Sequence, residues 1–167
     1  MIEILRGDIT KLEVDAIVNA ANAELAGGGG VDGAIHRAAG PELEEACMRL
    51  GGCPTGSAVL TPGFELPARF IIHAVGPIWR GGGAGEAAQL RGAYEASFAR
   101  AREQGTIRSI AFPAISSGIY GFPKDQAARI ALEAMKRHEA EFDRVIACVF
   151  DERTEALYRQ ALLEMGR

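Results

Sequence analysis

The 167-residue sequence predicts one α/β domain in which a mostly parallel sheet of about six strands carries helices on both faces. Apolar runs rich in β-branched residues recur along the chain, and stretches with apolar residues at helical spacing separate them. A chain of this length, with 48% apolar residues, is long enough for one well-covered core, since such a domain buries roughly 70% of its unfolded surface. No repeat, low-complexity tract or linker divides it, so residues 1–167 are expected to form a single domain.

The strands are expected where β-branched and other apolar residues cluster. The six candidate strands are residues 2–5, 16–18, 57–61, 70–75, 107–112 and 144–150. Apolar residues that recur every three or four positions predict helices after the fourth, fifth and sixth strands. The apolar faces of these helices carry, in order, Leu90, Tyr94, Phe98 and Ala101; Ala127, Ile130, Ala131, Ala134 and Met135; and Leu157, Ala161, Leu162 and Met165. Thr154 is expected to cap the last helix.

Composition excludes several classes of function. A net charge of −4 provides no broad cationic surface, which argues against long nucleic acid as the ligand. The apolar runs are too short to cross a bilayer, and the first residues lack the regions of a signal peptide, so a cytoplasmic location without membrane contact is expected. The three cysteines and three histidines lack the spacing of a disulfide framework or a metal site, so no metal or cofactor is expected.

The first unusual segment joins an asparagine-rich stretch at residues 19–22 to four consecutive glycines at residues 27–30. Consecutive glycines suit a backbone that approaches a ligand closely, and a helix expected to begin near Val31 would point its free amides at an anion. A plain flexible loop is the less favoured alternative, because a helix follows at once. Gly28, Gly30 and Gly33 also satisfy the G-x-G-x-x-G pattern of dinucleotide-binding domains, but the asparagine-rich loop before it does not fit that motif.

A second glycine-containing segment, residues 111–123, lies between a strand and a helix. Its small residues can turn successive amides toward one anion, and Tyr120 offers a ring to a sugar face. A tight connection ending at Pro123 is an equally good interpretation of this segment alone. Two such loops, each after a strand, favour a diphosphate held from both sides.

Asp8 and Phe150 follow the first and last candidate strands, and each has two interpretations. Asp8 either accepts a hydrogen bond from the exocyclic amine of a base or only shapes the turn, and its spacing alone favours the turn. Phe150 either stacks on a base or belongs to the core, which is the commoner place for an apolar residue at a strand end.

Four motifs together resemble the signature of macrodomains: Gly-Asp-Ile-Thr at 7–10, Asn-Ala-Ala-Asn at 19–22, the glycine-rich run through Asp32 to residue 40, and Ser-Gly-Ile-Tyr-Gly at 117–121. The resemblance covers nearly the whole chain and is strongest to MacroD-type hydrolases and bacterial O-acetyl-ADP-ribose deacetylases. It implies a three-layer α/β/α sandwich with a mixed central sheet.

The resemblance also implies a role for each candidate site residue. Asp8 and Ile9 would bind adenine with Phe150 against it, and Asn22 would bind the distal ribose on which Tyr120 packs. Asn19 is also expected at the ADP-ribose site, where it would support either the loop or the sugar. The diphosphate would be held by Gly28, Gly29, Gly30, Val31, Ser117, Gly118, Ile119, Tyr120 and Gly121, and Ser116 is also expected to bind ADP-ribose. Asp32 would orient or partly deprotonate the attacking water, with Asn22 as the second catalytic residue. The diphosphate of the substrate itself is the alternative group that would help to position this water. His36 lies one helical turn after Asp32, where it either steadies that carboxylate or is simply packed.

The expected substrates are O-acetyl-ADP-ribose and proteins with mono-ADP-ribose esterified to Asp or Glu. Macrodomains that only bind their ligand tend to lack the Asn and Asp that match Asn22 and Asp32, so the resemblance favours an enzyme over a reader of ADP-ribose. A nicotinamide-dependent oxidoreductase is the weakest alternative, since only the glycine spacing supports it. The absence of a coiled-coil pattern favours a monomer.

Overall fold

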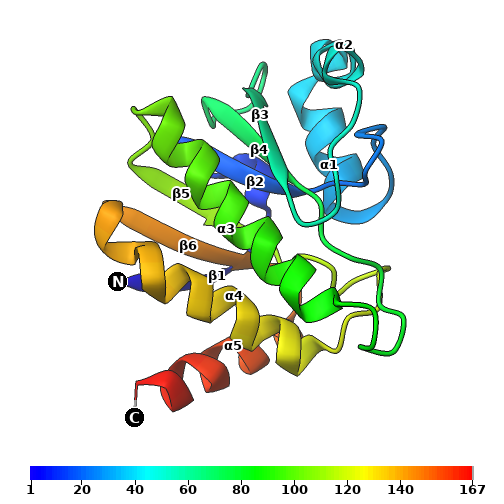
Figure 1. The fold of residues 1–167 in the computed structure, drawn as a ribbon. Helices are drawn as coiled ribbons and strands as arrows, with labels where there is room; N and C mark the ends of the chain where they lie inside the picture. Colours follow the sequence, from blue (N-terminus) through cyan, green and yellow to red (C-terminus); the bar gives the residue numbers. More distant parts are fainter. Residues whose placement is uncertain (167) are drawn as a thin grey trace.

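Six strands and five α-helices make up residues 1–166, the part of the chain that the computed structural model describes (Figure 1). The strands are β1 (Ile2–Arg6), β2 (Ala16–Ala20), β3 (Ala58–Pro62), β4 (Phe70–Ala74), β5 (Ser109–Phe112) and β6 (Arg144–Val149). The helices are α1 (Gly30–Ala39), α2 (Pro41–Leu50), α3 (Glu86–Gln104), α4 (Lys124–His138) and α5 (Glu152–Met165), with short 3-10 helices at Ile9–Lys11 and Glu139–Glu141. Within this range, no helix is long and apolar enough to span a membrane.

The strands form one mixed sheet in the order β1-β6-β5-β2-β4-β3. All neighbours are parallel except β3, which pairs antiparallel with β4 along the edge. The predicted mixed, mostly parallel sheet of about six strands is therefore confirmed. Because β1, β6, β5, β2 and β4 run in the same direction, the loops that follow them all leave the sheet at one edge.

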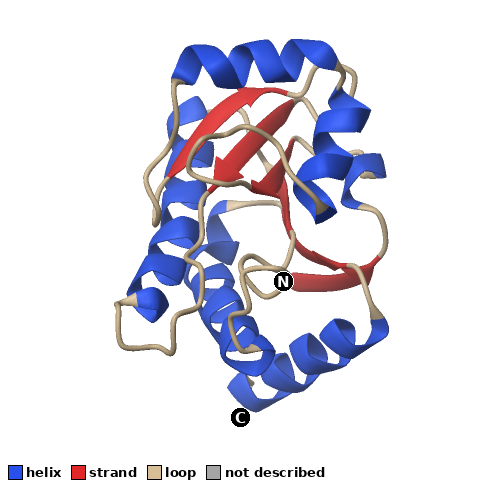
Figure 2. Ribbon diagram, turned by 90° about the vertical axis from the view of Figure 1, so that its right-hand side faces the viewer, coloured by secondary structure: helices blue, strands red, loops and turns tan. Residues whose placement is uncertain are grey.

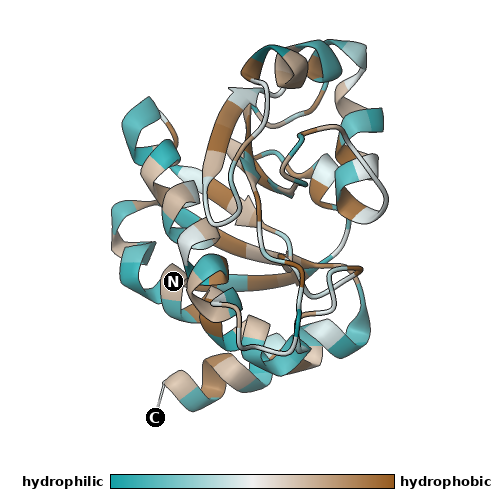
Figure 3. Ribbon diagram, turned by 45° about the vertical axis from the view of Figure 1, so that its right-hand side comes forward, coloured by the Kyte–Doolittle hydropathy of each residue, from teal (hydrophilic) through white to brown (hydrophobic). Residues whose placement is uncertain are grey.

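Helices cover both faces of the sheet, which gives the three-layer α/β/α sandwich (Figure 2). Helices α3, α4 and α5 pack on one face around Tyr94 and Phe98, and helices α1 and α2 pack on the other around Ile35 and Leu43. The strands are apolar along most of their length, while the helices alternate apolar and polar residues as expected for elements half in solvent (Figure 3). Cys47, Cys53 and Cys148 are free thiols, and all three lie in the core beneath α1 and α2.

Three local predictions differ from the structure. The fifth strand begins at Ser109 rather than residue 107, because the Asp15 carboxylate accepts the backbone amides of Arg108 and Ser109. Thr154 does not cap α5. Asp151 does, since its side chain accepts the Thr154 amide at 2.8 Å. Phe150 lies beyond the end of β6 and is 89% exposed, so the interpretation of Phe150 as a core residue is wrong.

Candidate active site

A cavity of about 320 Å³ opens where the loops after β2, β4 and β5 meet the start of α1. Each of these loops leaves the carboxyl end of a parallel strand, the edge at which α/β sheets bind their ligands. The cavity is lined by Ala20, Ala21, Asn22, Gly28, Gly29, Gly30, Val31, Asp32, Gly76, Ala114, Ile115, Ser116, Gly118, Ile119 and Tyr120. The two glycine-rich segments singled out in the sequence thus form two walls of one cavity.

The first wall is the approach to α1. Helix α1 begins at Gly30, and its N-cap Gly29 supplies no side-chain hydrogen bond to the first amides. Those amides can therefore donate hydrogen bonds to an anion, and the positive end of the helix dipole favours a negative charge at this place. Gly28 and Gly33 pack tightly here, because a Cβ added at Gly33 would lie 2.3 Å from the Gly28 carbonyl oxygen. The helix therefore carries the glycine loop directly on its first turn.

The second wall is the loop after β5, and it is held in a strained shape. Ser116 has a backbone φ of 65°, an unfavourable value for a residue with a side chain, and its Oγ donates to the Pro77 carbonyl at 2.8 Å. The Phe122 amide closes the loop by donating to the Ser116 carbonyl. Within residues 1–166, the amides of Ile119 and Tyr120 donate no hydrogen bond, so they too are available to an anion.

Asp32 lies on the first turn of α1 and is only 6% exposed. Its Oδ1 accepts a hydrogen bond from Asn19 Nδ2 at 2.8 Å and lies 3.4 Å from His36 Nε2. Burial raises the pKa of this carboxyl, while the Asn19 hydrogen bond and the His36 ring act in the opposite direction. Its Oδ2 has no partner among residues 1–166 and lies 3.5 Å from where a Cβ of Gly28 would sit, on the cavity side.

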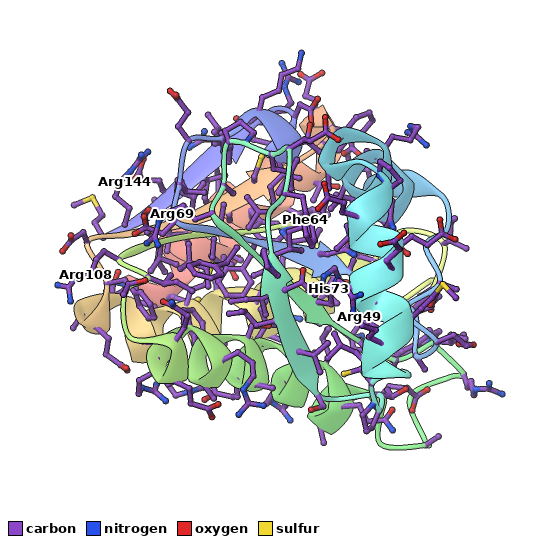
Figure 4. All side chains as sticks on the ribbon, turned by 90° about the horizontal axis from the view of Figure 1, so that it is seen from above. Arg49, Phe64, Arg69, His73, Arg108 and Arg144 are labelled. Carbon is purple, nitrogen blue, oxygen red and sulfur yellow. The ribbon has the colours of Figure 1, made fainter. Side chains whose placement is uncertain are left out.

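A buried chain of hydrogen bonds supports Asp32 from behind. Asn19 Nδ2 also contacts His73 Nδ1 at 3.1 Å, and His73 Nε2 contacts Thr61 Oγ1 at 3.0 Å. Because the amide nitrogen of Asn19 can only donate, His73 accepts at Nδ1 and carries its proton at Nε2. Burial lowers the pKa of His73 to about 3, so this ring is neutral at physiological pH. His73 lies between the sheet and the α1–α2 layer (Figure 4).

Asn22 and Tyr120 come from different loops, after β2 and β5, and both line the cavity. The side chain of Asn22 shapes its own loop: it donates to the Gly27 carbonyl at 2.9 Å and accepts the Ala26 amide at 3.0 Å. The Tyr120 ring is partly buried, and burial together with the charges of Glu24 and Asp32 raises the pKa of its hydroxyl. Tyr120 is therefore close to the catalytic candidate Asp32.

Asp8 and Phe150 lie together at the other end of the sheet edge, where β1 and β6 stop. The register pairs Arg6 with Val149, and the Gly7 amide donates to the Val149 carbonyl at 3.0 Å. Oδ1 of Asp8 caps the 3-10 helix at Ile9–Lys11 through the Thr10 hydroxyl and amide, and these bonds lower the pKa of Asp8. The turn-shaping role predicted for Asp8 is confirmed, while its Oδ2 has no hydrogen-bond partner among residues 1–166.

The predicted site residues thus occupy four positions. Ten of them line the cavity, Asn19 and His36 lie behind Asp32, and Asp8, Ile9 and Phe150 lie at the β1–β6 end. Ser117 and Gly121 belong to the same loop but face a neighbouring hollow with Lys124, whose Nζ donates to the Ser117 carbonyl at 2.6 Å. The loop of residues 116–121 therefore lines the cavity on one side and the hollow next to Lys124 on the other.

Sequence reasoning missed Gly76, which lines the cavity after β4. A Cβ at this position would lie 2.2 Å from Ser116 Oγ, so only glycine lets the β4 loop pass the β5 loop this closely. Its position directly after a strand end was the available signal. Thr61 and His73 were missed as partners of Asn19, because residues from three strands meet only after the sheet forms. Among residues 1–166, no group of three or more acidic, histidine or cysteine side chains is placed to hold a metal ion.

Comparison with known proteins gives one consistent result. The Macro domain family model matches residues 18–131. A Macro domain-containing protein of Ralstonia nicotianae is 59% identical over 160 residues, which cover 96% of this chain and 93% of that protein. ADP-ribose glycohydrolase MACROD1 of Bos taurus is 52% identical over 166 residues, which cover 96% of this chain and 51% of that protein.

Solved structures agree with the sequence comparison. The Oceanobacillus iheyensis macrodomain with ADP superimposes with a TM-score of 0.92 at 43% identity, covering 98% of this chain and 90% of that one. The Trypanosoma brucei macrodomain in complex with ADP-ribose superimposes with a TM-score of 0.87 at 42% identity, covering 96% and 68% of the two chains.

Proposed function

The chain belongs to the macrodomain family, and from this membership and the geometry of the cavity we propose that it is a hydrolase of acyl esters formed on ADP-ribose. Its substrates are proteins with mono-ADP-ribose esterified to Asp or Glu side chains, and O-acetyl-ADP-ribose. The observation that carries the proposal is the Asp32 carboxylate, which is buried between two anion-binding loops with Oδ2 free. Relatives named ADP-ribose glycohydrolase support it.

The ligand follows the order of the strands. Adenine lies at the β1–β6 end, where Asp8 Oδ2 accepts from its amine, Ile9 lies beside it, and the exposed ring of Phe150 covers it. The diphosphate lies between the glycine loop at the start of α1 and the loop after β5, whose free amides point at one cavity. The distal ribose then reaches Asn22 and Tyr120.

Hydrolysis adds one water across the ester bond, so that ADP-ribose leaves with a hydroxyl group and the acyl group leaves as a carboxylic acid. Oδ2 of Asp32 accepts a hydrogen bond from that water and orients it, while Oδ1 stays fixed by Asn19. Burial raises the pKa of Asp32 and so makes this carboxylate a better proton acceptor than an exposed one. Asn22 and Tyr120 hold the ribose that carries the ester.

The spacing of the site agrees with variants studied in a relative. Structures of the Oceanobacillus iheyensis macrodomain include one variant with an aspartate changed to alanine and one with an asparagine changed to alanine. The separation of those two positions along that chain equals the separation of Asn22 and Asp32 here. This match supports the assignment of Asn22 and Asp32 as the catalytic pair.

The first experiment incubates the purified protein with a carrier that bears glutamate-linked mono-ADP-ribose and follows free ADP-ribose by chromatography. We expect release by the native protein and none by Asp32→Ala, with ADP-ribose affinity retained in the variant by calorimetry. If Asp32→Ala released ADP-ribose as fast as the native protein, Asp32 would not have the proposed catalytic role. Binding without release from either the carrier or O-acetyl-ADP-ribose would make the protein a reader of ADP-ribose.

A further inference from the structure

A second cavity, of about 350 Å³, continues from the first. The two cavities share Asn22, Gly76 and Tyr120, the residues at the distal-ribose end of the proposed ligand. Its other lining residues are Ala23, Glu24, Thr55, Val75, Pro77, Ile78, Arg80, Ala84, Glu86 and Gln89. No part of ADP-ribose is assigned to this second cavity.

The order of the strands gives the second cavity its place along the ligand. From one side of the sheet, β1 and β6 carry the adenine end, β5 and β2 carry the diphosphate loops, and β4 leads into the segment that lines the second cavity. The second cavity therefore lies beyond the distal ribose. An acyl group esterified to that ribose on the side away from the diphosphate would lie next to this space, because the two cavities share Asn22, Gly76 and Tyr120.

The wall formed by residues 80–84 is held in a fixed shape. The Glu86 carboxylate accepts the backbone amides of Arg80 at 2.8 Å, Gly82 at 3.0 Å and Ala84 at 2.7 Å. These hydrogen bonds, first those from Arg80 and Gly82, lower the pKa of Glu86 to about 2, so the carboxylate stays ionised at physiological pH. The Trp79 amide donates to the Tyr120 carbonyl at 2.8 Å, which ties this wall to the ribose end of the first cavity.

Two charges at this cavity are left without a partner. Arg80 and Glu24 are exposed, and within residues 1–166 neither forms an ion pair, whereas the carboxylate of Glu86 is fully used by backbone amides. Ile78 is 49% exposed at the same rim. A free guanidinium beside an apolar residue fits an extended polypeptide with a carboxylate side chain.

We propose that this second cavity binds the polypeptide segment that flanks the ester-linked Asp or Glu of a mono-ADP-ribosylated protein, with Arg80 paired to an acidic side chain of that segment. The proposal rests on the proposed function, because it requires the ester to lie between Asn22 and Tyr120. Glu24, on the opposite loop, repels a second carboxylate and so sets the direction in which an acidic segment lies.

The test compares three substrates: a peptide mono-ADP-ribosylated on one glutamate with acidic flanks, the same peptide with serine flanks, and O-acetyl-ADP-ribose. The variant is Arg80→Glu, with Arg80→Gln as a milder change. The control is Arg108→Glu, an exposed arginine next to Arg69 and Arg144 in Figure 4 and outside the cavities described above, where it forms an exposed ion pair with Asp143 at 3.4 Å.

We expect Arg80→Glu to raise the KM of the acidic peptide about fivefold, the effect of one exposed ion pair, and Arg80→Gln to raise it less. High salt should reduce the difference. The serine peptide and O-acetyl-ADP-ribose should be turned over as by the native protein, and Arg108→Glu should change nothing. The inference is overturned if Arg80→Glu shifts both peptides equally or neither. Failure of the native protein on all three substrates would instead contradict the proposed function.

Discussion

Asn19 matters through what it does to Asp32 rather than through the ligand. Its side chain is completely buried and donates to both Asp32 Oδ1 and His73 Nδ1. A buried carboxylate without such a donor holds its proton to higher pH, because the charged form loses its hydration. Asn19 therefore lowers the pKa of Asp32 and opposes the effect of burial.

This role predicts the pH dependence of Asn19→Ala. Loss of the hydrogen bond that lowers the pKa of Asp32 leaves burial as the dominant effect, so the folded-state pKa rises further. Because the proposed mechanism uses the ionised carboxylate, the acidic limb of kcat/KM against pH should move to higher pH. Asn22→Ala is the control: it should lower the rate without moving the limb, since Asn22 bonds only its own loop. Superimposable acidic limbs for Asn19→Ala and the native protein would contradict this role.

Thr61 ends the buried series of hydrogen bonds that runs from Asp32 through Asn19 and His73, and it gives a prediction about stability. Thr61→Val keeps the shape of the side chain but leaves the His73 Nε2 proton without an acceptor in a site where His73 is fully buried. An unpaired buried donor of this kind costs about 1–3 kcal/mol of the free energy of unfolding, measured by urea denaturation. The exposed Thr106→Val should change it by less than about 0.5 kcal/mol. Equal stabilities for the two variants would show that the hydrogen bond contributes nothing.

The residues found from the sequence are those whose neighbours along the chain reveal them. Asp32 stands inside a glycine run that suits an anion, and Asn22 lies between that run and a strand, so both were identified as site residues. His73, Thr61 and Gly76 were not, because their partners come from other strands. Contacts between distant segments depend on the strand order, which the sequence does not state.

The element that most directly shapes the site is α1, because its first turn carries the diphosphate loop. Gly33→Ala should normally stabilise a helix by about 1 kcal/mol. Here the added Cβ would lie 2.3 Å from the Gly28 carbonyl oxygen, so the loop must move and its amides lose their aim at the diphosphate. We expect ADP-ribose affinity by calorimetry to fall about tenfold or more, the value of one lost hydrogen bond to a charged group.

The matched control for Gly33→Ala is Gly83→Ala, where an added Cβ meets no atom within 4 Å. This variant should bind ADP-ribose as tightly as the native protein. If Gly33→Ala also binds normally, the contact between α1 and the glycine loop is not what positions the amides.

All six strands were predicted. The four inner strands β2, β4, β5 and β6 are buried along most of their length and so read as apolar runs, and the partly exposed edge strands β1 and β3 still contain apolar and β-branched residues. Helix α2 was not identified, although Leu43, Ala46, Cys47 and Leu50 recur in it at helical spacing and Pro41 stands in its first turn. The capping residue of α5 was misplaced because Asp151 and Thr154 are both good caps, and only the backbone turn after Phe150 selects Asp151. The sequence pattern thus predicted where most strands and helices lie better than it predicted the residues at which they begin and end.

At the scale of the whole molecule, the proposed ligand spans the sheet from β1 to β4, so its binding should stabilise the domain as one unit. ADP-ribose at a hundred times its dissociation constant adds about 2.7 kcal/mol to the free energy of unfolding. We expect a single thermal transition that moves upward with ligand concentration in scanning calorimetry. In Asp8→Ala the same ligand concentration should produce a smaller shift. Two transitions, of which only one responds to ligand, would show that the two ends of the site unfold separately.

The position of the three cysteines has a practical consequence. All of them lie beneath α1 and α2, and the core under α3, α4 and α5 contains none. Burial raises the pKa of Cys47 and Cys148 to about 11, so neither thiol reacts with alkylating reagents at neutral pH while that layer is closed. The rate at which these thiols are alkylated therefore reports how often the layer that bears the glycine loop opens. Bound substrate should lower that rate.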